Sequence, residues 1–265
     1  MKYTAGGALR KYDVNCSILF TDLPLLERPA AAKAAGFDAV EFWWPFGADP
    51  TPADADIDAF VTSISDAGVQ LVGLNFIDLI PAGRGLVSIP GQETRFRDNI
   101  DVAIGIAERT GCKALNALYG NRIAAENPEK QDELALENLR LAATAARRIG
   151  ATVLLEALNS YESQDYPIVS AAHAVRIIEA VGEPGVRFLC DLYHLARMGE
   201  NLPAVIDTYG GYIGHVQIAD SPGRGRPGTG ALDFAELFAA LDASGYDGYI
   251  GLEYKDPELN WEWIK

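Results

Sequence analysis

The segment VLLEALNSYE (residues 153–162) places a carboxylate, Glu156, inside an apolar run whose length and composition are typical of a buried strand. Burying an unpaired carboxylate is costly, so buried acids normally have a partner or a chemical task. Similar runs with a late polar residue recur further along the chain. The segment therefore raises two linked questions: what kind of sheet contains it, and what its acid faces.

Eight β-rich runs alternate with amphipathic helical patterns from one end of the chain to the other. The helical patterns lie near residues 23–35, 54–67, 93–110, 130–149, 168–182, 203–209 and 233–244. The runs that we predict to be strands are VNCSILF (14–20), DAVEFWW (38–44), QLVGLNF (70–76), KALNALY (113–119), TVLLEAL (152–158), VRFLCDL (186–192), GHVQIAD (214–220) and YIGLEYK (249–255).

Strands that alternate with helices pair in parallel, because each helix carries the chain back across the sheet. Eight such units in 265 residues match a (β/α)8 TIM barrel, which typically needs about 250 residues. The alternative, an open doubly wound sheet, would place a GxGxxG turn after the first strand, where this chain has TDLPLLE (21–27). No linker or shift in composition divides the chain, so we expect residues 1–265 to form a single α/β domain of the TIM-barrel class.

Short local signals mark the expected ends of the helices. Asp22 and Thr51 are expected N-caps, because Pro or an acidic residue follows each of them in the first turn. Glycines are expected to end the helices as C-caps in AAGFDAV (34–40), DAGVQLV (66–72), RIGATVL (148–154) and ASGYDGY (243–249).

The composition restricts the class of partner. The chain is 49% hydrophobic and carries a net charge of −15. This charge disfavours binding to nucleic acid or to an anionic membrane, both of which attract basic surfaces. Three widely spaced cysteines, no apolar run of about 18 residues and no hydrophobic leader favour a cytoplasmic protein without disulfides. A small-molecule partner is expected, and a homo-oligomer is left open.

Strand parity brings four oxygen-bearing side chains to one end of the expected barrel. Alternate side chains of a barrel strand point inward, and active sites lie at the carboxyl ends of the strands. In the last four predicted strands, the inward polar residues late in the strand are Glu156, Asp191, Gln217 and Glu253. Each is separated from the next by about one strand–helix unit.

Three carboxylates that converge on one place repel one another unless a cation lies between them. Because all four candidate donors are oxygens, we expect a hard divalent cation, Mg²⁺ or Mn²⁺, rather than zinc, which prefers nitrogen and sulfur. The alternative is that these residues form salt bridges or point outward to the helices. That alternative explains one acid more easily than four polar residues at matched positions.

With these motifs in place, the chain resembles the hydroxypyruvate isomerase family of the xylose-isomerase-like TIM barrels, a superfamily that includes ketose 3-epimerases. The resemblance covers nearly the whole chain. The segments that carry it are NCSILFTDLPLLERPAAAKAAGFDAVEFWWP (15–45), LNALYGNR (115–122), LLEALN (154–159), FLCDLYH (188–194), HVQIAD (215–220) and GLEYK (251–255).

The resemblance implies a role for each of the four residues. Glu156, Asp191, Gln217 and Glu253 would bind the divalent metal, and Glu156 and Glu253 would be the catalytic pair that exchanges protons with substrate carbons. The epimerases usually have His where this chain has Gln217. This difference favours the hydroxypyruvate-isomerase branch over epimerisation of free ketoses.

Three further residues are expected to contact the substrate. His194, in FLCDLYH, resembles the family's ligand of a substrate oxygen. Glu162 resembles a ligand of substrate hydroxyls, with a solvated loop acid as the alternative. Trp43 is expected to form a wall of the pocket, with core packing as the alternative.

Four basic residues are candidates for binding a substrate carboxylate: Arg224 and Arg226 as a clamp, and Arg122 and Lys255 as further candidates. Arg224 lies in the glycine-rich segment SPGRGRPGTGALDF (221–234), and arginine binds carboxylates through two parallel hydrogen bonds. Lys255 follows Glu253 by two residues, so we expect it on the same face of the last strand.

The expected reaction moves a carbonyl between adjacent carbons of a small hydroxy-oxo acid. Hydroxypyruvate would become tartronate semialdehyde, or 2-oxotetronate would become 3-oxotetronate, through an enediolate, with the two glutamates as base and acid. A ketose 3-epimerase, another sugar isomerase and an inosose dehydratase are alternatives within the superfamily. A non-catalytic sugar-acid binding protein is the alternative from another class. A relative of endonuclease IV is disfavoured, because its zinc cluster is rich in histidine and this chain has three histidines.

Overall fold

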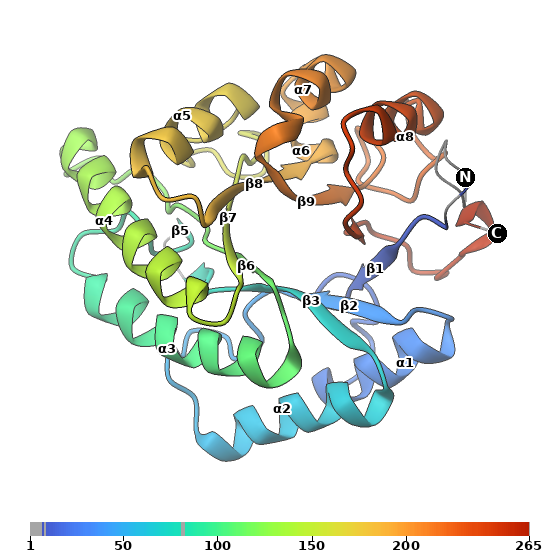
Figure 1. Ribbon diagram of the computed structural model, residues 1–265, viewed down its shortest axis with the longest axis horizontal. Helices are drawn as coiled ribbons and strands as arrows, with labels where there is room; N and C mark the ends of the chain where they lie inside the picture. The colour runs from blue at the N-terminus through green and yellow to red at the C-terminus, as the bar shows by residue number, and fades with distance from the viewer. Residues whose placement is uncertain (1–6, 8, 81–82, 265) are drawn as a thin grey trace.

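The computed structural model describes residues 7, 9–80 and 83–264, and its centre is a closed barrel of eight parallel strands (Figure 1). Around the barrel the strand order is β1, β10, β9, β8, β7, β6, β3 and β2. The predicted TIM-barrel class is therefore confirmed. The strands are β1 (Tyr12–Asn15), β2 (Ala39–Phe42), β3 (Gln70–Asn75), β6 (Ala114–Asn116), β7 (Thr152–Glu156), β8 (Val186–Asp191), β9 (Ile213–Ile218) and β10 (Ile250–Leu252).

Helices form a ring around the outside of the barrel, because each parallel connection crosses back over the strands (Figure 1). Within the described ranges, no helix is both long enough and apolar enough to cross a bilayer. The helices are α1 (Arg28–Ala34), α2 (Asp54–Ala67), α3 (Glu93–Thr110), α4 (Pro128–Arg147), α5 (Ala171–Val181), α6 (Leu192–Arg197), α7 (Leu202–Tyr209) and α8 (Phe234–Ala243), with short 3-10 turns η1 (Leu25–Glu27), η2 (Gly210–Tyr212) and η3 (Glu262–Ile264).

An antiparallel hairpin of β4 (Leu79–Ile80) and β5 (Gly83–Arg84) lies beyond the carboxyl end of β3. Gly85, directly after the hairpin, has a φ of +86°, and a Cβ there would lie 1.9 Å from the carbonyl oxygen of Leu118. Only glycine fits this close approach. The backbone N–H of Gly85 also donates to the carbonyl of Asp78 at 2.7 Å. These contacts seat the base of the hairpin against the loop that follows β6.

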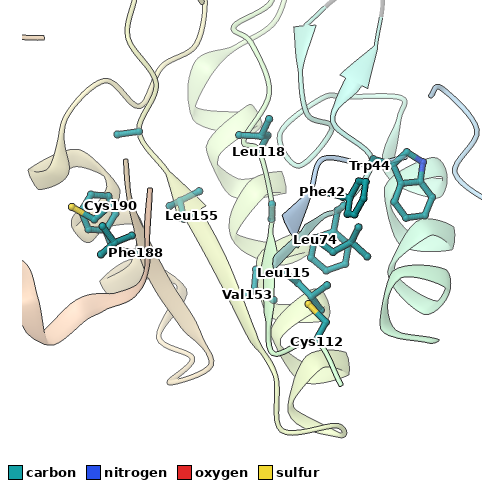
Figure 2. Close-up of a cluster of buried hydrophobic side chains, with 14 of the residues drawn as sticks. Phe42, Trp44, Leu74, Cys112, Leu115, Leu118, Val153, Leu155, Phe188 and Cys190 are labelled. Atoms are coloured by element: carbon teal, nitrogen blue, oxygen red, sulfur yellow. The ribbon is translucent and has the colours of Figure 1, made fainter. Parts of the chain in front are cut away.

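The main apolar core lies between the barrel strands and the surrounding helices. Val153 and Leu155 of β7 are fully buried in this core (Figure 2). Leu154, which lies between them in the sequence, belongs instead to a separate small cluster with Ala114 and Leu189 inside the barrel. The alternation expected from strand parity is therefore present in β7.

The inside of the barrel is mostly polar, whereas branched apolar residues fill most TIM barrels. Glycines on two strands leave space for these polar side chains. A Cβ at Gly73 would lie 3.0 Å from Glu41 Oε2, and one at Gly251 would lie 2.8 Å from Glu41 Oε1. The buried polar residues around this space are Asp13, Asn15, Glu41, Asn75, Asn116 and His215.

Several predicted element ends differ from the structure. The predicted strand 249–255 is shorter, since β10 ends at Leu252. The predicted N-caps Asp22 and Thr51 are wrong. The N-cap of α1 is Glu27, because η1 precedes the helix, and the N-cap of α2 is Ala53. Neither residue makes a side-chain capping hydrogen bond. Of the predicted glycine C-caps, Gly68 is confirmed as the left-handed C-cap of α2, whereas α1, α4 and α8 are capped by Ala35, Arg148 and Ser244, one or two residues before the predicted glycines.

Gly251→Ala should lower the free energy of unfolding by about 1–3 kcal/mol, the usual effect of overpacking a rigid interior. The new methyl carbon would lie 2.8 Å from Glu41 Oε1 and 3.0 Å from Gln217 Cγ. Glu41 cannot swing away without losing the hydrogen bonds that hold both of its oxygens. Urea denaturation followed by circular dichroism measures the change.

Gly105→Ala is the matched control for this substitution. Gly105 lies within α3, and a Cβ there would meet nothing within 4 Å. Replacing a helix glycine by alanine should raise the stability by about 0.5–1 kcal/mol. Equal stability of Gly251→Ala and the wild type would contradict the packing argument.

Candidate functional site

Four oxygen-bearing side chains meet at the carboxyl ends of four neighbouring strands. Glu156 is the last residue of β7, Asp191 is the last residue of β8, Gln217 is the penultimate residue of β9, and Glu253 directly follows β10. Each is no more than 5% exposed. Asp191 also pairs in register with Gln217 across the sheet. The structure thus gathers at one end of the barrel the residues that strand parity selected.

The three carboxylates are crowded enough to affect one another's protonation. Burial, followed by the charges of Glu253 and Asp191, raises the pKa of Glu156 well above its ordinary value. Burial also raises the pKa of Asp191 to about 6. For Glu253, burial outweighs the opposing charge of Arg224 and raises the pKa to about 8. Burial is the first cause for all three acids, and a cation placed between them would lower these pKa values.

The donor set fits a hard divalent cation. Gln217 Nε2 donates to Glu41 Oε1 at 2.8 Å, whereas Gln217 Oε1 is buried and accepts no hydrogen bond from any residue that the structure describes. A buried acceptor without a donor is destabilising, and coordination to a cation would satisfy it. Carboxylate and amide oxygens are the ligands that Mg²⁺ and Mn²⁺ prefer.

Asp191 is held rigidly at the start of a helix. It is the N-cap of α6, and its Oδ1 accepts the backbone N–H groups of Tyr193 at 2.7 Å and His194 at 3.1 Å. Its Oδ2 is not used for capping. Asp191 therefore has one oxygen fixed by the helix and one oxygen free to act as a ligand.

His194 is a neutral side chain that directs an N–H at the acids. Its Nδ1 accepts the backbone N–H of Asn159 at 3.0 Å. Burial, with a smaller contribution from two nearby arginines, holds the pKa of His194 well below its ordinary value. The proton of the neutral ring therefore lies on Nε2. This atom lies 3.7 Å from Asp191 Oδ2 and 4.0 Å from Glu156 Oε1.

Amide and indole donors orient the two glutamates. Asn116, at the end of β6, donates Nδ2 to Glu156 Oε2 at 2.8 Å. Trp43, directly after β2, donates its indole N–H to Glu253 Oε1 at 2.6 Å, and Asn15 donates to the same oxygen at 3.3 Å. Each glutamate thus has one oxygen held by neutral donors.

Arg224 forms ion pairs at the rim of the site. Its Nη2 lies 3.1 Å from Glu253 Oε2, and its Nη1 lies 3.5 Å from Glu162 Oε2. The guanidinium also lies over the ring of Tyr193, 5.1 Å from its centroid, and the Tyr193 hydroxyl donates to Glu162 at 2.9 Å. The positive charge of Arg224 is therefore divided between two carboxylates.

A small cavity of about 70 Å³ lies beside the acids and opens to solvent. Lys255 does not line this cavity and is exposed. Its expected place on the face of Glu253 is wrong, because the strand ends before both residues. Trp43, Glu162, His194 and Arg224 do line the cavity, whereas Arg122 and Arg226 pair with Asp132 and Asp256 and do not.

A second buried group lies deeper in the barrel. Glu41 accepts hydrogen bonds from Asn15 at 3.0 Å and Gln217 at 2.8 Å, and its Oε2 lies 2.9 Å from His215 Nε2. Burial and the charge of Glu41 raise the pKa of Asp13 well above its ordinary value. For His215, burial lowers the pKa, but the hydrogen bond and charge of Glu41 outweigh it and raise the pKa to about 9.

We call Asp13, Asn15, Glu41 and His215 the Glu41 group. Our sequence reasoning applied parity only to the last four strands and missed the group's members in β1 and β2. Glu41 in DAVEFWW is an acid within a short apolar run, which is the signal that identified Glu156. Parity applied to the second predicted strand would have found Glu41, whereas Asp13 precedes the first predicted strand (14–20) and would have been missed.

Comparison with known proteins places the chain among characterised barrels. Residues 29–264 match the family model described as xylose isomerase-like TIM barrel. A Streptomyces coelicolor protein, provisionally named hydroxypyruvate isomerase, is 56% identical, with 98% of this chain and 97% of that protein aligned. The hydroxypyruvate isomerase of Escherichia coli is 32% identical, with 92% and 93% aligned.

The fold is also shared with a solved structure. A crystal structure described as an AP endonuclease, family 2, from Brucella melitensis has a TM-score of 0.84 to this chain and is 34% identical to it. The match covers 94% of each chain. The barrel and its connections are therefore similar from end to end.

Exchanging the side-chain types of Glu41 and Gln217 tests whether Glu41 orients the amide of Gln217. In Glu41→Gln, residue 41 becomes a donor as well as an acceptor, so the amide of Gln217 loses its fixed orientation. We expect the Mn²⁺ affinity to fall by about 10–100-fold, as is typical when a metal ligand loses its hydrogen-bond partner. In Glu41→Gln/Gln217→Glu the donor and the acceptor are exchanged, so the affinity should recover. Isothermal titration calorimetry measures each affinity.

Gln217→Glu alone completes the double-mutant cycle and separates the effect of added charge from that of restored pairing. Circular dichroism checks that each variant is folded. Wild-type Mn²⁺ affinity in Glu41→Gln, or purely additive effects of the two substitutions, would show that Glu41 does not orient Gln217.

Proposed function

We propose that this chain, an isomerase of the hydroxypyruvate isomerase family, shifts the carbonyl of a small hydroxy-oxo acid by one carbon. The family belongs to the xylose isomerase-like TIM barrels. The first candidate substrate is hydroxypyruvate, which would give tartronate semialdehyde. The second is 2-oxotetronate, which has the same reacting carbons and one more hydroxymethylene. The observation that carries the proposal is the pair of buried, oriented glutamates, Glu156 and Glu253, beside the N–H of His194.

The reaction needs two proton transfers at adjacent carbons. One glutamate removes a proton from C3 of hydroxypyruvate, and the electron pair forms the C2–C3 double bond of an enediolate while the oxygen on C2 becomes negative. The other glutamate then delivers a proton to C2, the hydroxyl on C3 loses its proton to the oxygen on C2, and the carbonyl forms at C3. The isomerisation is redox-neutral and needs no further reactant.

The hydrogen bonds of the two glutamates suit this exchange. Asn116 holds only Oε2 of Glu156, and Trp43 and Asn15 hold only Oε1 of Glu253. The remaining oxygen of Glu156 is left to take or to give a proton, and that of Glu253 lies 3.1 Å from Arg224, which a proton transfer at Glu253 would have to displace or share. A base that is held in position loses little entropy on reaching the transition state.

His194 has a separate task in this proposal. Its N–H on Nε2 is directed at the same acids, and its Nδ1 is blocked by Asn159. A neutral donor of this kind stabilises the negative charge that develops on a substrate oxygen. The hydrogen bond from Asn159 keeps the ring in the tautomer that this task requires.

Glu156, Asp191, Gln217 and Glu253 would hold the divalent cation, with Mg²⁺ or Mn²⁺ as the candidates. When bound, it supplies Lewis-acid stabilisation of the negative charge on substrate oxygens. The chain contributes the geometry, since α6 holds Asp191 and Glu41 holds Gln217.

A substrate panel tests the proposed function. The protein is incubated with hydroxypyruvate, 2-oxotetronate and free ketoses, with and without Mg²⁺ or Mn²⁺, and the products are identified by NMR. Metal-dependent isomerisation of one of the acids is the expected result. Turnover of ketoses alone would favour a ketose 3-epimerase. Binding of acids without turnover would favour a sugar-acid binding protein.

Asp191→Ala should lose metal affinity and activity together, because it removes a proposed ligand. It also removes the cap of α6, at a cost of about 0.5–2 kcal/mol in stability. Asp191→Asn separates the two roles, because asparagine also caps helices but carries no charge. Metal affinity by calorimetry and stability by urea denaturation are measured for both. Wild-type metal affinity in Asp191→Ala would refute the ligand assignment.

Replacing either Glu156 or Glu253 by Gln should lower the rate by at least about 10²–10⁴-fold, the usual contribution of general acid–base catalysis. Metal affinity should fall less than in Asp191→Ala, because an amide oxygen can still coordinate. The double variant should be scarcely slower than either single one, since the pair acts as a unit.

Isotope incorporation tests whether Glu156 and Glu253 are the proton-transfer pair. In D₂O, wild-type turnover should place deuterium on the substrate carbon that receives the proton, and NMR detects it. If Glu156→Gln isomerises hydroxypyruvate and 2-oxotetronate at the wild-type rate, Glu156 has only a structural role.

A further inference from the structure

Arg84 places a positive charge in the cavity wall, and no carboxylate of the described residues pairs with it. It is the last residue of β5 and lines the cavity together with Glu156, Glu253 and His194. Among the residues that the structure describes, its side chain takes part in no ion pair and no hydrogen bond. A partly buried guanidinium with five N–H donors and no acceptor is open to a ligand.

The other arginine of the cavity is already engaged. Arg224 lies 3.1 Å from Glu253 and 3.5 Å from Glu162, so its charge is offset by protein carboxylates. An anionic group that approached Arg224 would have to compete with both acids. Arg84 needs no such exchange, so it is the better site for an external carboxylate.

The hairpin holds Arg84 in place. Its backbone pairs with Leu79, and Gly85, the next residue, packs against the backbone of Leu118 and donates to Asp78. Arg84 lines the same cavity as Glu156 and Glu253. The guanidinium is therefore presented to the cavity from a fixed base.

We infer that Arg84 binds the carboxylate of the substrate and so selects oxo acids over uncharged sugars, an inference that rests on the proposed function. The cavity is otherwise lined by the carboxylates of Asp78, Glu156, Glu162 and Glu253, which repel an anion. A carboxylate paired with Arg84 would be bound through two parallel hydrogen bonds. With the carboxylate on Arg84, the carbonyl end of a short acid is left to face the two glutamates.

The test compares acidic and uncharged ligands in wild type, Arg84→Gln and Arg84→Lys, all with Mn²⁺ present. Calorimetry measures binding of D-glycerate, an unreactive acid with the carbon skeleton of hydroxypyruvate. Arg84→Gln should weaken this binding by about 10–100-fold, the usual effect of losing hydrogen bonds to a charged group. Arg84→Lys should recover part of the loss, because lysine restores the charge without the paired geometry.

Kinetics supply a second readout. In Arg84→Gln the KM for hydroxypyruvate should rise by about 10–100-fold with a smaller change in kcat, because the carboxylate is bound equally in the ground and transition states. The preference for hydroxypyruvate over dihydroxyacetone, its uncharged counterpart, should shrink by a similar factor. Arg122→Gln is the control. Arg122 follows β6, pairs with Asp132 at 2.7 Å and does not line the cavity.

Two results would overturn the inference. One is unchanged binding of D-glycerate in Arg84→Gln. The other is an equal loss of activity toward hydroxypyruvate and dihydroxyacetone, which would indicate a structural role. Failure of the proposed function is distinguishable, because the wild type would then not isomerise either acid, whereas the D-glycerate titrations would still report on Arg84.

Discussion

The buried carboxylate of Glu41 is the interaction on which the mouth of the barrel depends. Both of its oxygens are engaged, one by Asn15 and Gln217 and the other by His215. Because the Gln217 amide must present its nitrogen to Glu41, its oxygen faces the acids above. Asn15 transmits the same constraint to Glu253. The carboxylate of Glu41 therefore helps to orient Gln217 and, through Asn15, Glu253 in the candidate cation site.

The two buried groups differ in how their charge is balanced. Burial and the charge of Glu41 raise the pKa of Asp13, the hydrogen bond and charge of Glu41 raise the pKa of His215 to about 9, and the imidazole of His215 lies 2.9 Å from Glu41, so the Glu41 group contains its own basic partner. Around Glu156, Asp191 and Glu253, Arg224 forms an ion pair with Glu253, and Arg84 lines the same cavity. The Glu41 group thus has its own basic partner, whereas Glu156, Asp191 and Glu253 could accept a further positive charge.

Sequence reasoning predicted the barrel from eight alternating strand and helix patterns, and it predicted the site residues Glu156, Asp191, Gln217 and Glu253 from period-two alternation within the strands. Glu156 and Asp191 end strands whose alternate residues face the barrel interior, so counting by two reaches them. Lys255 lies beyond the end of β10, where alternation no longer applies. Arg84 could not be found in this way, since its place depends on a two-residue hairpin and on the close approach of Gly85 to Leu118. No periodic pattern encodes such contacts.

The contacts of Glu41 also bear on how the chain folds. Its partners His215 and Gln217 lie 174 and 176 positions later in the sequence. Contacts between residues so far apart form late, because a long loop must close first. Until β9 arrives, Asp13 and Glu41 must stay hydrated, and the two N-terminal strands that carry them cannot bury their inner faces. During synthesis on the ribosome, the N-terminal half therefore emerges with Asp13 and Glu41 before their partners in the C-terminal half exist. Closure of the barrel and dehydration of these two carboxylates then occur together.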